Sequence, residues 1–133
     1  MSGSAEHDAA LPGGPPTALL LCADLMFAVR LQNMARAAGF SYVSVRPGAP
    51  LPPGELLVVD LASRGDWEQA IREAAGRGTT VVAFGPHMDA DARKRAKAAG
   101  ATRVLANSNL ARDLPGLLHK IRGKTAEPAR DNA

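Results

Sequence analysis

The stretch Glu55-Leu56-Leu57-Val58-Val59-Asp60 places four apolar residues, two of them β-branched, in front of a single aspartate. Residues 52–54 (Pro-Pro-Gly) precede it, and residues 63–65 (Ser-Arg-Gly) follow it. A short, nearly continuous apolar run between such breakers is typical of a strand buried on both faces, as in parallel sheets. Asp60 would then stand at the carboxyl end of the strand, the edge of open α/β sheets where ligands and chemistry collect.

The sequence on either side predicts strands that alternate with helices. Asp24 and Asp66 precede helical patterns as N-caps, because a carboxylate there can accept from unpaired backbone N–H groups. Glycines close most of these patterns, as expected at helix ends. The predicted strands cover residues 17–22, 41–46, 55–60, 79–84 and 103–106, and the predicted helices cover residues 24–38, 66–76, 87–99 and 107–122.

The segment 47–54 contains four prolines in eight residues. Proline lacks a backbone N–H and clashes within a helix interior, so a helix is not expected here. Eight residues reach at most ~28 Å, which suffices for an extended, polyproline-like crossover that passes over one neighbouring strand.

This element order predicts an α/β fold: a doubly wound, five-stranded parallel sheet in the order 2-1-3-4-5, flavodoxin-like, whose second helix is replaced by the proline-rich loop. Asp60 lies at the topological switch point between the first and third strands. We expect the folded domain to span residues 17–122. Residues 1–16 and 123–133 are too poor in apolar side chains to form a core and are expected to be disordered tails.

Composition excludes several classes of function. The net charge of +3 and the 4% aromatic content do not support nucleic-acid binding. The longest apolar run, residues 18–23, is too short to span a bilayer, and no signal peptide is evident. A single cysteine, Cys22, rules out an internal disulfide and fits a cytoplasmic protein. No Gly-rich phosphate loop and no Ser/His or Cys/His catalytic arrangement is present, so we do not expect an enzyme.

The element order, Asp60 at the end of the third strand and the run Ala98-Ala99-Gly100-Ala101 before the fifth strand resemble the receiver domains of bacterial two-component response regulators, the single-domain chemotaxis regulator among them. The resemblance covers nearly all of residues 17–122. It implies that Asp60 occupies the position of the aspartate that accepts a phosphoryl group. It also implies that protein partners dock on the fourth helix, the fifth strand and the fifth helix.

The other groups of a receiver site are missing. Cys22 and Ala23, followed by Asp24, stand where the resemblance implies two acidic Mg²⁺ ligands. Gly85 replaces the usual Ser or Thr, and Asn107 replaces the usual Lys. His87 lies in a loop at the same edge and is a further neighbour of the site. The sequence therefore predicts a degenerate receiver, or pseudo-receiver, with no cofactor, and with Mg²⁺ only if Asp60 is phosphorylated.

We therefore expect a single-domain phosphorelay-type signalling protein that acts by protein–protein interaction without efficient phosphorylation. Two alternatives stay open: a receiver phosphorylated on Asp60 with an atypical metal site, and a small-molecule binder at the switch point. The expected partner is a protein, of a kind whose acidic surface would suit a basic face, and it is neither nucleic acid nor a membrane. The chain itself would be a monomer or weak dimer. The expected partner-binding residues are Arg93, Lys94, Lys97 and Arg103.

Overall fold

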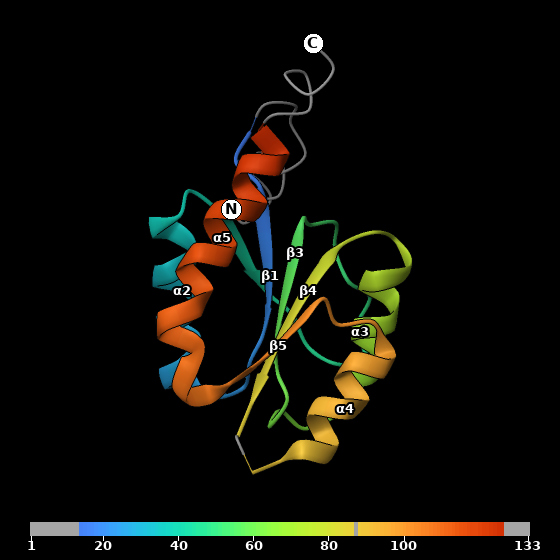
Figure 1. The fold of residues 1–133 in the computed structure, drawn as a ribbon. Helices are drawn as coiled ribbons and strands as arrows, with labels where there is room; N and C mark the ends of the chain where they lie inside the picture. Colours follow the sequence, from blue (N-terminus) through green and yellow to red (C-terminus); the bar gives the residue numbers. More distant parts are fainter. Residues whose placement is uncertain (1–13, 87, 127–133) are drawn as a thin grey trace.

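The computed structural model describes residues 14–86 and 88–126. Within this part of the chain, the central strand β3 (Leu56–Asp60) is buried along its whole length, as its apolar sequence requires. It lies in a five-stranded parallel sheet of order β2-β1-β3-β4-β5, which confirms the predicted order (Figure 1). The other strands are β1 (Thr17–Leu21), β2 (Ser41–Ser44), β4 (Thr80–Gly85) and β5 (Arg103–Ala106).

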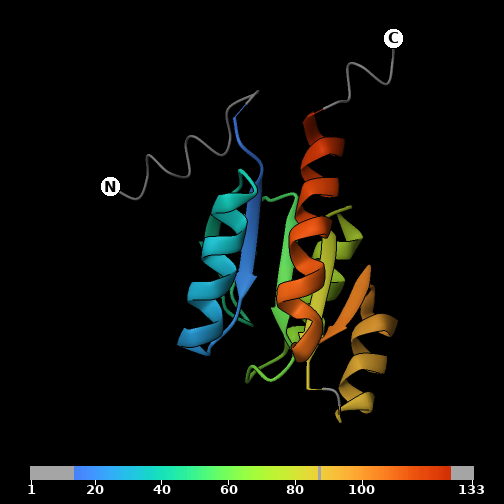
Figure 2. The same ribbon diagram turned by 60° about the vertical axis from the view of Figure 1, so that its left-hand side comes forward.

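Helices cover both faces of the sheet, as right-handed crossovers between parallel strands require (Figure 2). One face packs against α2 (Leu25–Ala37) and α5 (Leu110–Ala126), and the other packs against α3 (Trp67–Gly76) and α4 (Ala90–Ala99). Alternate strand residues supply the two cores. Leu57 and Val59 belong to the α3/α4 core, whereas Val58 belongs to the α2/α5 core. None of the described helices is long and apolar enough to cross a membrane.

The proline-rich crossover has the predicted form. Residues 45–55, all of which the structure describes, contain no helix. Leu51 is the buried anchor of this segment and packs in the α3/α4 core. The guanidinium of Arg77, at the end of α3, donates to the carbonyl of Leu51 at 3.1 Å and also to the carbonyl of Pro52. The backbone of the crossover is therefore held by a side chain that lies about 25 residues further along the chain.

The described structure extends slightly past both ends of the expected domain, residues 17–122. Pro16 is buried, and its carbonyl accepts a hydrogen bond of 2.8 Å from the N–H of Ser41, so the ordered chain begins before residue 17. At the other end α5 continues to Ala126 rather than stopping at residue 122. Helix propagation adds one backbone hydrogen bond per residue without needing a buried face, which lets the last turn extend past the core. The remaining tail residues lie outside the described part.

Two helices differ in detail from the prediction. The α4 helix begins at Ala90, with Asp89 as its cap, so the predicted start at residue 87 is wrong. In α5 the fully buried residues are Leu110, Leu114 and Leu118, whereas Leu117 and Ile121 are only partly buried. The spacing of four residues follows one face of the helix, and Leu117 and Ile121 lie at its margin. A short 3₁₀ turn, Asn107–Asn109, precedes α5, and Pro115 lies inside the helix.

Candidate functional site

Asp60 ends β3 and is 4% exposed, so its carboxylate is almost completely removed from bulk water. Oδ1 accepts a hydrogen bond of 3.0 Å from the backbone N–H of Ala62, and the thiol of Cys22 donates to Oδ2 at 3.5 Å. The N–H of Ser63 donates to the Asp60 carbonyl at 3.0 Å. The loop after β3 therefore folds back on Asp60 and supplies part of the hydrogen bonding that a buried carboxylate needs.

Cys22 follows β1, the strand next to β3, which explains why it meets Asp60. Burial and, next, the negative charge of Asp60 raise the pKa of the Cys22 thiol to about 12. Both effects disfavour a thiolate. Near neutral pH Cys22 is thus a protonated thiol that serves as a hydrogen-bond donor, and its reactivity as a nucleophile is low.

Asp24 acts as the predicted N-cap of α2. Its Oδ1 accepts from the backbone N–H groups of Met26 at 2.8 Å and Phe27 at 3.1 Å. These bonds satisfy two of the unpaired donors in the first turn of the helix. One carboxylate oxygen of Asp24 is therefore committed to the helix, although the residue lies beside Asp60.

A hollow of about 550 Å³ at the carboxyl edge brings several predicted neighbours of Asp60 together. Its described lining consists of Ala23, Asp24, Phe27, Asp60, Ala62, Ser63, Arg64 and Asn107. Ser63 and Arg64 were not predicted as site residues, although their place in the loop directly after Asp60 was the available signal. The hydroxyl of Ser63 and Oδ1 of Asn107 are buried, and neither has a hydrogen-bond partner within the described chain.

Two other predicted neighbours, Cys22 and Gly85, are not among the described residues that line this hollow. Gly85, the last residue of β4, is buried, and a Cβ at this position would lie 3.3 Å from the side chain of Leu61. That distance is tighter than most contacts, so Leu61 would have to move to admit the Ser or Thr of a typical receiver. His87 lies outside the described residues.

The resemblance to receiver domains implies a Mg²⁺ ion beside Asp60. The side chains around Asp60 do not fit this ion. Mg²⁺ prefers several oxygen ligands in near-octahedral geometry. A protonated thiol at Cys22 and a methyl group at Ala23 supply no such ligand. Within the described residues no group of three or more His, Cys, Asp or Glu side chains is placed to hold a metal ion.

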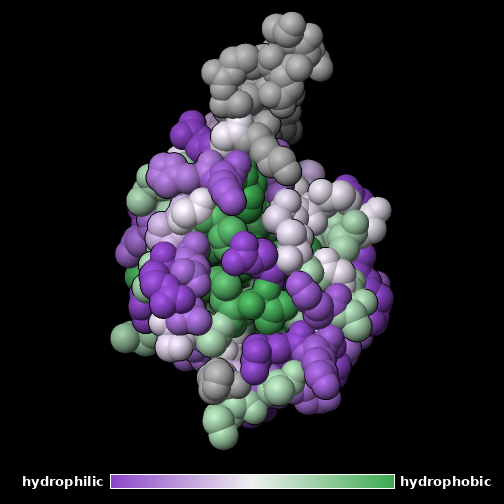
Figure 3. All heavy atoms as spheres, in the orientation of Figure 1, coloured by the Kyte–Doolittle hydropathy of each residue, from purple (hydrophilic) through white to green (hydrophobic). Residues whose placement is uncertain are grey.

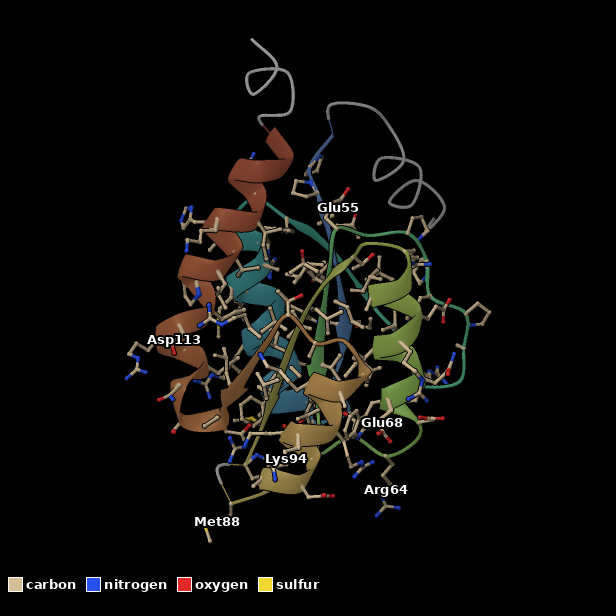
Figure 4. The ribbon with its side chains drawn as sticks, turned by 45° about the vertical axis from the view of Figure 1, so that its right-hand side comes forward. Glu55, Arg64, Glu68, Met88, Lys94 and Asp113 are labelled. Carbon is tan, nitrogen blue, oxygen red and sulfur yellow. The ribbon has the colours of Figure 1, made fainter. Side chains whose placement is uncertain are left out.

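The predicted docking residues lie on two elements, Arg93, Lys94 and Lys97 on α4 and Arg103 at the start of β5, where Arg103 faces the α5 side of the sheet. Their exposure also differs. Lys94, Lys97 and Arg103 are exposed, and Figure 4 shows Lys94 on α4. Arg93, also expected to bind a partner, is half-buried and so less accessible than the two lysines. Its place in the helix, next to the buried Ala92, brings its stem against the protein.

Arg95 of α4 interacts within the domain. Its guanidinium lies 2.9 Å from Oε1 of Glu68 and 4.9 Å from the ring centre of Trp67, both on α3. The hydrogen bond from Arg95 holds the pKa of Glu68 below its usual value. The exposed basic face is therefore narrower than the run of basic residues in the sequence suggests.

No protein-family model matches the chain, and no curated protein matches its sequence. Its fold, in contrast, matches solved receiver domains of response regulators over most of its length. The receiver domain of a sensor histidine kinase from Pseudomonas aeruginosa is 20% identical, with a TM-score of 0.69, and the match covers 83% of this chain and 99% of that one. That structure has a magnesium ion coordinated in its active-site cleft.

A second similar structure is a response regulator from Thermotoga maritima, 17% identical with a TM-score of 0.64, covering 82% of this chain and 98% of that one. A third is the CheY-like receiver domain protein from Methanospirillum hungatei, 10% identical with a TM-score of 0.65, covering 84% and 99%. These identities are low, so the comparisons establish that the chain has the CheY-like, flavodoxin-like receiver fold. They do not assign it a function.

Proposed function

We propose that this protein is a receiver-type signalling module that works through protein–protein contacts, without efficient phosphorylation of Asp60, and that it is not an enzyme. The observation that carries the proposal is the pairing of a buried Asp60 with the protonated thiol of Cys22. An uncharged thiol stands where a receiver carries a carboxylate that holds the metal cation needed for phosphoryl transfer. The receiver fold supports the signalling role.

Phosphoryl transfer depends on electrostatic stabilisation, because the protein contributes mainly position and charge. Among the described residues that line the hollow, Arg64 is the one cation, and Asn107 is neutral. Arg64 is exposed and follows Asp60 in a loop. A flexible surface cation stabilises a phosphoryl group much less than a bound Mg²⁺ does. The same Arg64 supports the second candidate function, a receiver phosphorylated on Asp60 by atypical chemistry.

The two candidates differ in one measurement. The full chain is incubated with acetyl phosphate and Mg²⁺, quenched in acid and examined by intact mass spectrometry. We expect no species carrying an added phosphoryl group. The Asp60→Asn variant is the control for modification elsewhere. A phosphorylated species that is absent from this variant would overturn the proposal in favour of the second candidate.

A gain-of-function variant tests the physical reason. We expect the triple variant Cys22→Asp/Ala23→Asp/Asn107→Lys to bind Mg²⁺ and to accept a phosphoryl group from acetyl phosphate, because it supplies two carboxylates and a fixed cation. The matched control carries Cys22→Asn/Ala23→Asn/Asn107→Lys, which provides similar side-chain volumes without the negative charges. Equal phosphorylation of both variants would show that the missing carboxylates are not the cause.

The proposed docking face consists of Lys94, Lys97 and Arg103, with Arg93 at its margin. Three of these side chains are exposed on α4 and β5, and α4 is held to the core mainly by the small residues Ala92 and Ala96. A basic face attracts an acidic partner and increases its rate of association. An element held by little apolar area can also shift when a partner binds.

A further inference from the structure

A second hollow, of about 760 Å³, lies at the amino edge of the sheet between the starts of β3, β4 and β5 and the last turns of α5. Figure 3 shows a green apolar strip between α5 and the edge of the sheet, bordered by purple polar side chains. Figure 4 places Glu55, which lines this hollow, at the end of the sheet opposite to Arg64 and Met88. The hollow is therefore separate from the surroundings of Asp60.

The strand register explains why this region is open. Strand pairing between β4 and β5 begins at Val82 and Arg103, so Thr80 at the start of β4 has no β5 residue beside it. On the α5 face of the sheet, the space is bounded by Leu117 and Ile121, which are only partly buried. Val82, Leu117 and Ile121 form an apolar floor. Apolar side chains that are partly exposed at a concave surface favour contact with an apolar ligand.

The charged residues in the described rim of the hollow are cationic except for Glu55, and several of the polar groups already form hydrogen bonds. Glu55, the acidic residue in the described lining, accepts a hydrogen bond of 2.6 Å from the N–H of Thr17. Arg77 donates to carbonyls of the proline-rich crossover, and the hydroxyl of Thr79 donates to the carbonyl of Gly54 at 3.0 Å. These groups define the wall of the hollow.

Other rim groups are available to a ligand. Within the part of the chain that the structure describes, neither the ammonium of Lys120 nor the hydroxyl of Thr80 has a hydrogen-bond or ion-pair partner. Arg103 lines the same side of the hollow. The hydroxyl oxygen of Thr102 accepts from the N–H of Val81 at 3.1 Å, which leaves its hydrogen free to donate. The available groups are therefore donors, and two of them carry positive charge.

We propose that this hollow binds a small amphipathic anion, a carboxylate attached to an aliphatic or aromatic body. The body would contact Leu117 and Ile121, which lie beside the buried Val82, and the carboxylate would lie between Lys120 and Arg103 and accept from the hydroxyl of Thr80. The volume is within the range of ordinary small-molecule sites, about 300–1,000 Å³. The charge of the rim selects an anion over a neutral ligand, because a neutral ligand would desolvate the cations without pairing them. This proposal is independent of the behaviour of Asp60.

The test is a titration of the ¹⁵N-labelled full chain with octanoate, followed by NMR. We expect saturable changes in the amide signals of Thr79, Thr80, Thr102 and Arg103, and no change at Ala62 and Ser63. Octanol, which has the same chain without the charge, should bind at least several-fold more weakly. Octanoate binding should also weaken with added salt, because the ion pairs at the rim are exposed.

Two variants locate the ligand. Lys120→Glu should weaken octanoate binding by about tenfold, because it replaces attraction by repulsion at an exposed site. Lys97→Glu, an equal charge reversal on α4 outside the hollow, should leave it unchanged. Thr80→Tyr should abolish binding by filling the hollow with an aromatic side chain, which strands accommodate well. If Thr80→Tyr fails to fold, Lys120→Glu and octanol still decide the outcome.

Several results would overturn the proposal. One is the absence of any saturable change, another is a change centred on Ala62 and Ser63, and a third is equal affinity for octanol and octanoate. Deletion of residues 1–13 supplies one more. The deletion could shift the amide signals of Thr80 and Arg103 while octanoate leaves them unchanged. That result would mean that residues 1–13, rather than a small anion, occupy the hollow, and the proposed ligand would be wrong.

Discussion

Asp60 is a buried carboxylate whose side chain accepts hydrogen bonds, within the described residues, from a backbone amide and a thiol. Removing a carboxylate from water costs free energy that neutral hydrogen bonds recover only in part. In a receiver with a bound metal ion, the cation would compensate for that cost. Here the neighbouring positions that would help to hold such a cation carry the thiol of Cys22 and the methyl group of Ala23.

The first prediction follows from this environment. Asp60→Asn should change the free energy of unfolding by less than about 1 kcal/mol, or raise it, because the amide oxygen can still accept from Ala62 and the buried charge is removed. Urea denaturation at neutral pH measures this. Asp60→Ala is the control and should cost about 1–3 kcal/mol, since it leaves buried donors unpaired. Equal destabilisation by Asn and Ala would mean that the charge itself holds the loop.

Cys22 gives a prediction about pH. Its pKa is raised from 9.0 to about 12 in the folded protein, so between these values the folded state binds the proton that the unfolded state has lost. The stabilisation linked to the thiol is therefore complete below pH 9 and disappears as the pH rises toward 12. We expect the wild type to lose more stability than Cys22→Ala over this range, with the other titrating groups cancelling in the comparison.

Denaturation of both proteins at several pH values between 8 and 11 provides the measurement. This range begins below the ordinary pKa of 9.0 and rises into the interval between the two pKa values. If the stabilities of the two proteins changed with pH in the same way, the raised pKa of the Cys22 thiol would be contradicted. A faster reaction of Cys22 with iodoacetamide at neutral pH than that of an unfolded peptide would contradict it as well, because a raised pKa leaves little thiolate.

At the scale of elements, Gly100 sets how α4 connects to β5. It has a φ of 120°, and a Cβ at this position would lie 2.7 Å from Cβ of Ala75 in α3. Both the backbone conformation and the close approach of the two segments require glycine. This contact places the end of α4 directly against α3, and so fixes the spacing of the two helices on their face of the sheet.

We therefore expect Gly100→Ala to lower the free energy of unfolding by about 1–3 kcal/mol, through backbone strain and overpacking. Gly76→Ala is the matched control. Gly76 is the last residue of α3. Apart from its sequence neighbours and the nearby backbone of its own helix, no atom lies within 4 Å of a Cβ built at this position. The control should be neutral or stabilising by up to about 1 kcal/mol. Thermal or urea denaturation of both variants measures these changes. If Gly100→Ala left the free energy of unfolding unchanged, the packing argument would be refuted.

The surface of the whole molecule offers two competing docking faces. One is the basic face of Lys94, Lys97 and Arg103, and the other is an apolar patch on α2, where Leu25 is 80% and Val29 is 52% exposed. Screening by salt weakens contacts between exposed charges, whereas apolar contacts respond little. Salt dependence therefore distinguishes the two faces.

Once a partner has been isolated, we expect Lys94→Glu/Lys97→Glu to reduce its affinity by at least tenfold and to abolish most of its salt dependence. Val29→Glu should have little effect. Binding is measured at two salt concentrations, with melting temperatures as the control for folding. Loss of binding in Val29→Glu alone would transfer the interface to α2 and end the hypothesis of a basic docking face.

Short-range sequence patterns were sufficient to predict the helices and strands and their order along the chain. The apolar run before Asp60, the caps Asp24 and Asp66, and the prolines of residues 47–54 act through the residues next to them. Their consequences were therefore predictable. The position of Asp60 at the carboxyl edge also followed, since parallel strands share their direction.

The exact ends of α4 and α5 were less predictable. A helix ends where the free energy of one more backbone hydrogen bond differs little from that of the same groups bonded to water.

The contacts that give the two hollows their chemistry join residues far apart in the chain, and only the tertiary structure decided them. Cys22 meets Asp60 because β1 and β3 are neighbours, although 38 residues separate them. The hollow at the amino edge exists because β5 starts opposite Val82 and leaves Thr80 uncovered. Strand register and packing depend on all the side chains of both cores together. No local pattern contains that information, which is why the sequence by itself determined the fold and the place of Asp60 but not what surrounds either hollow.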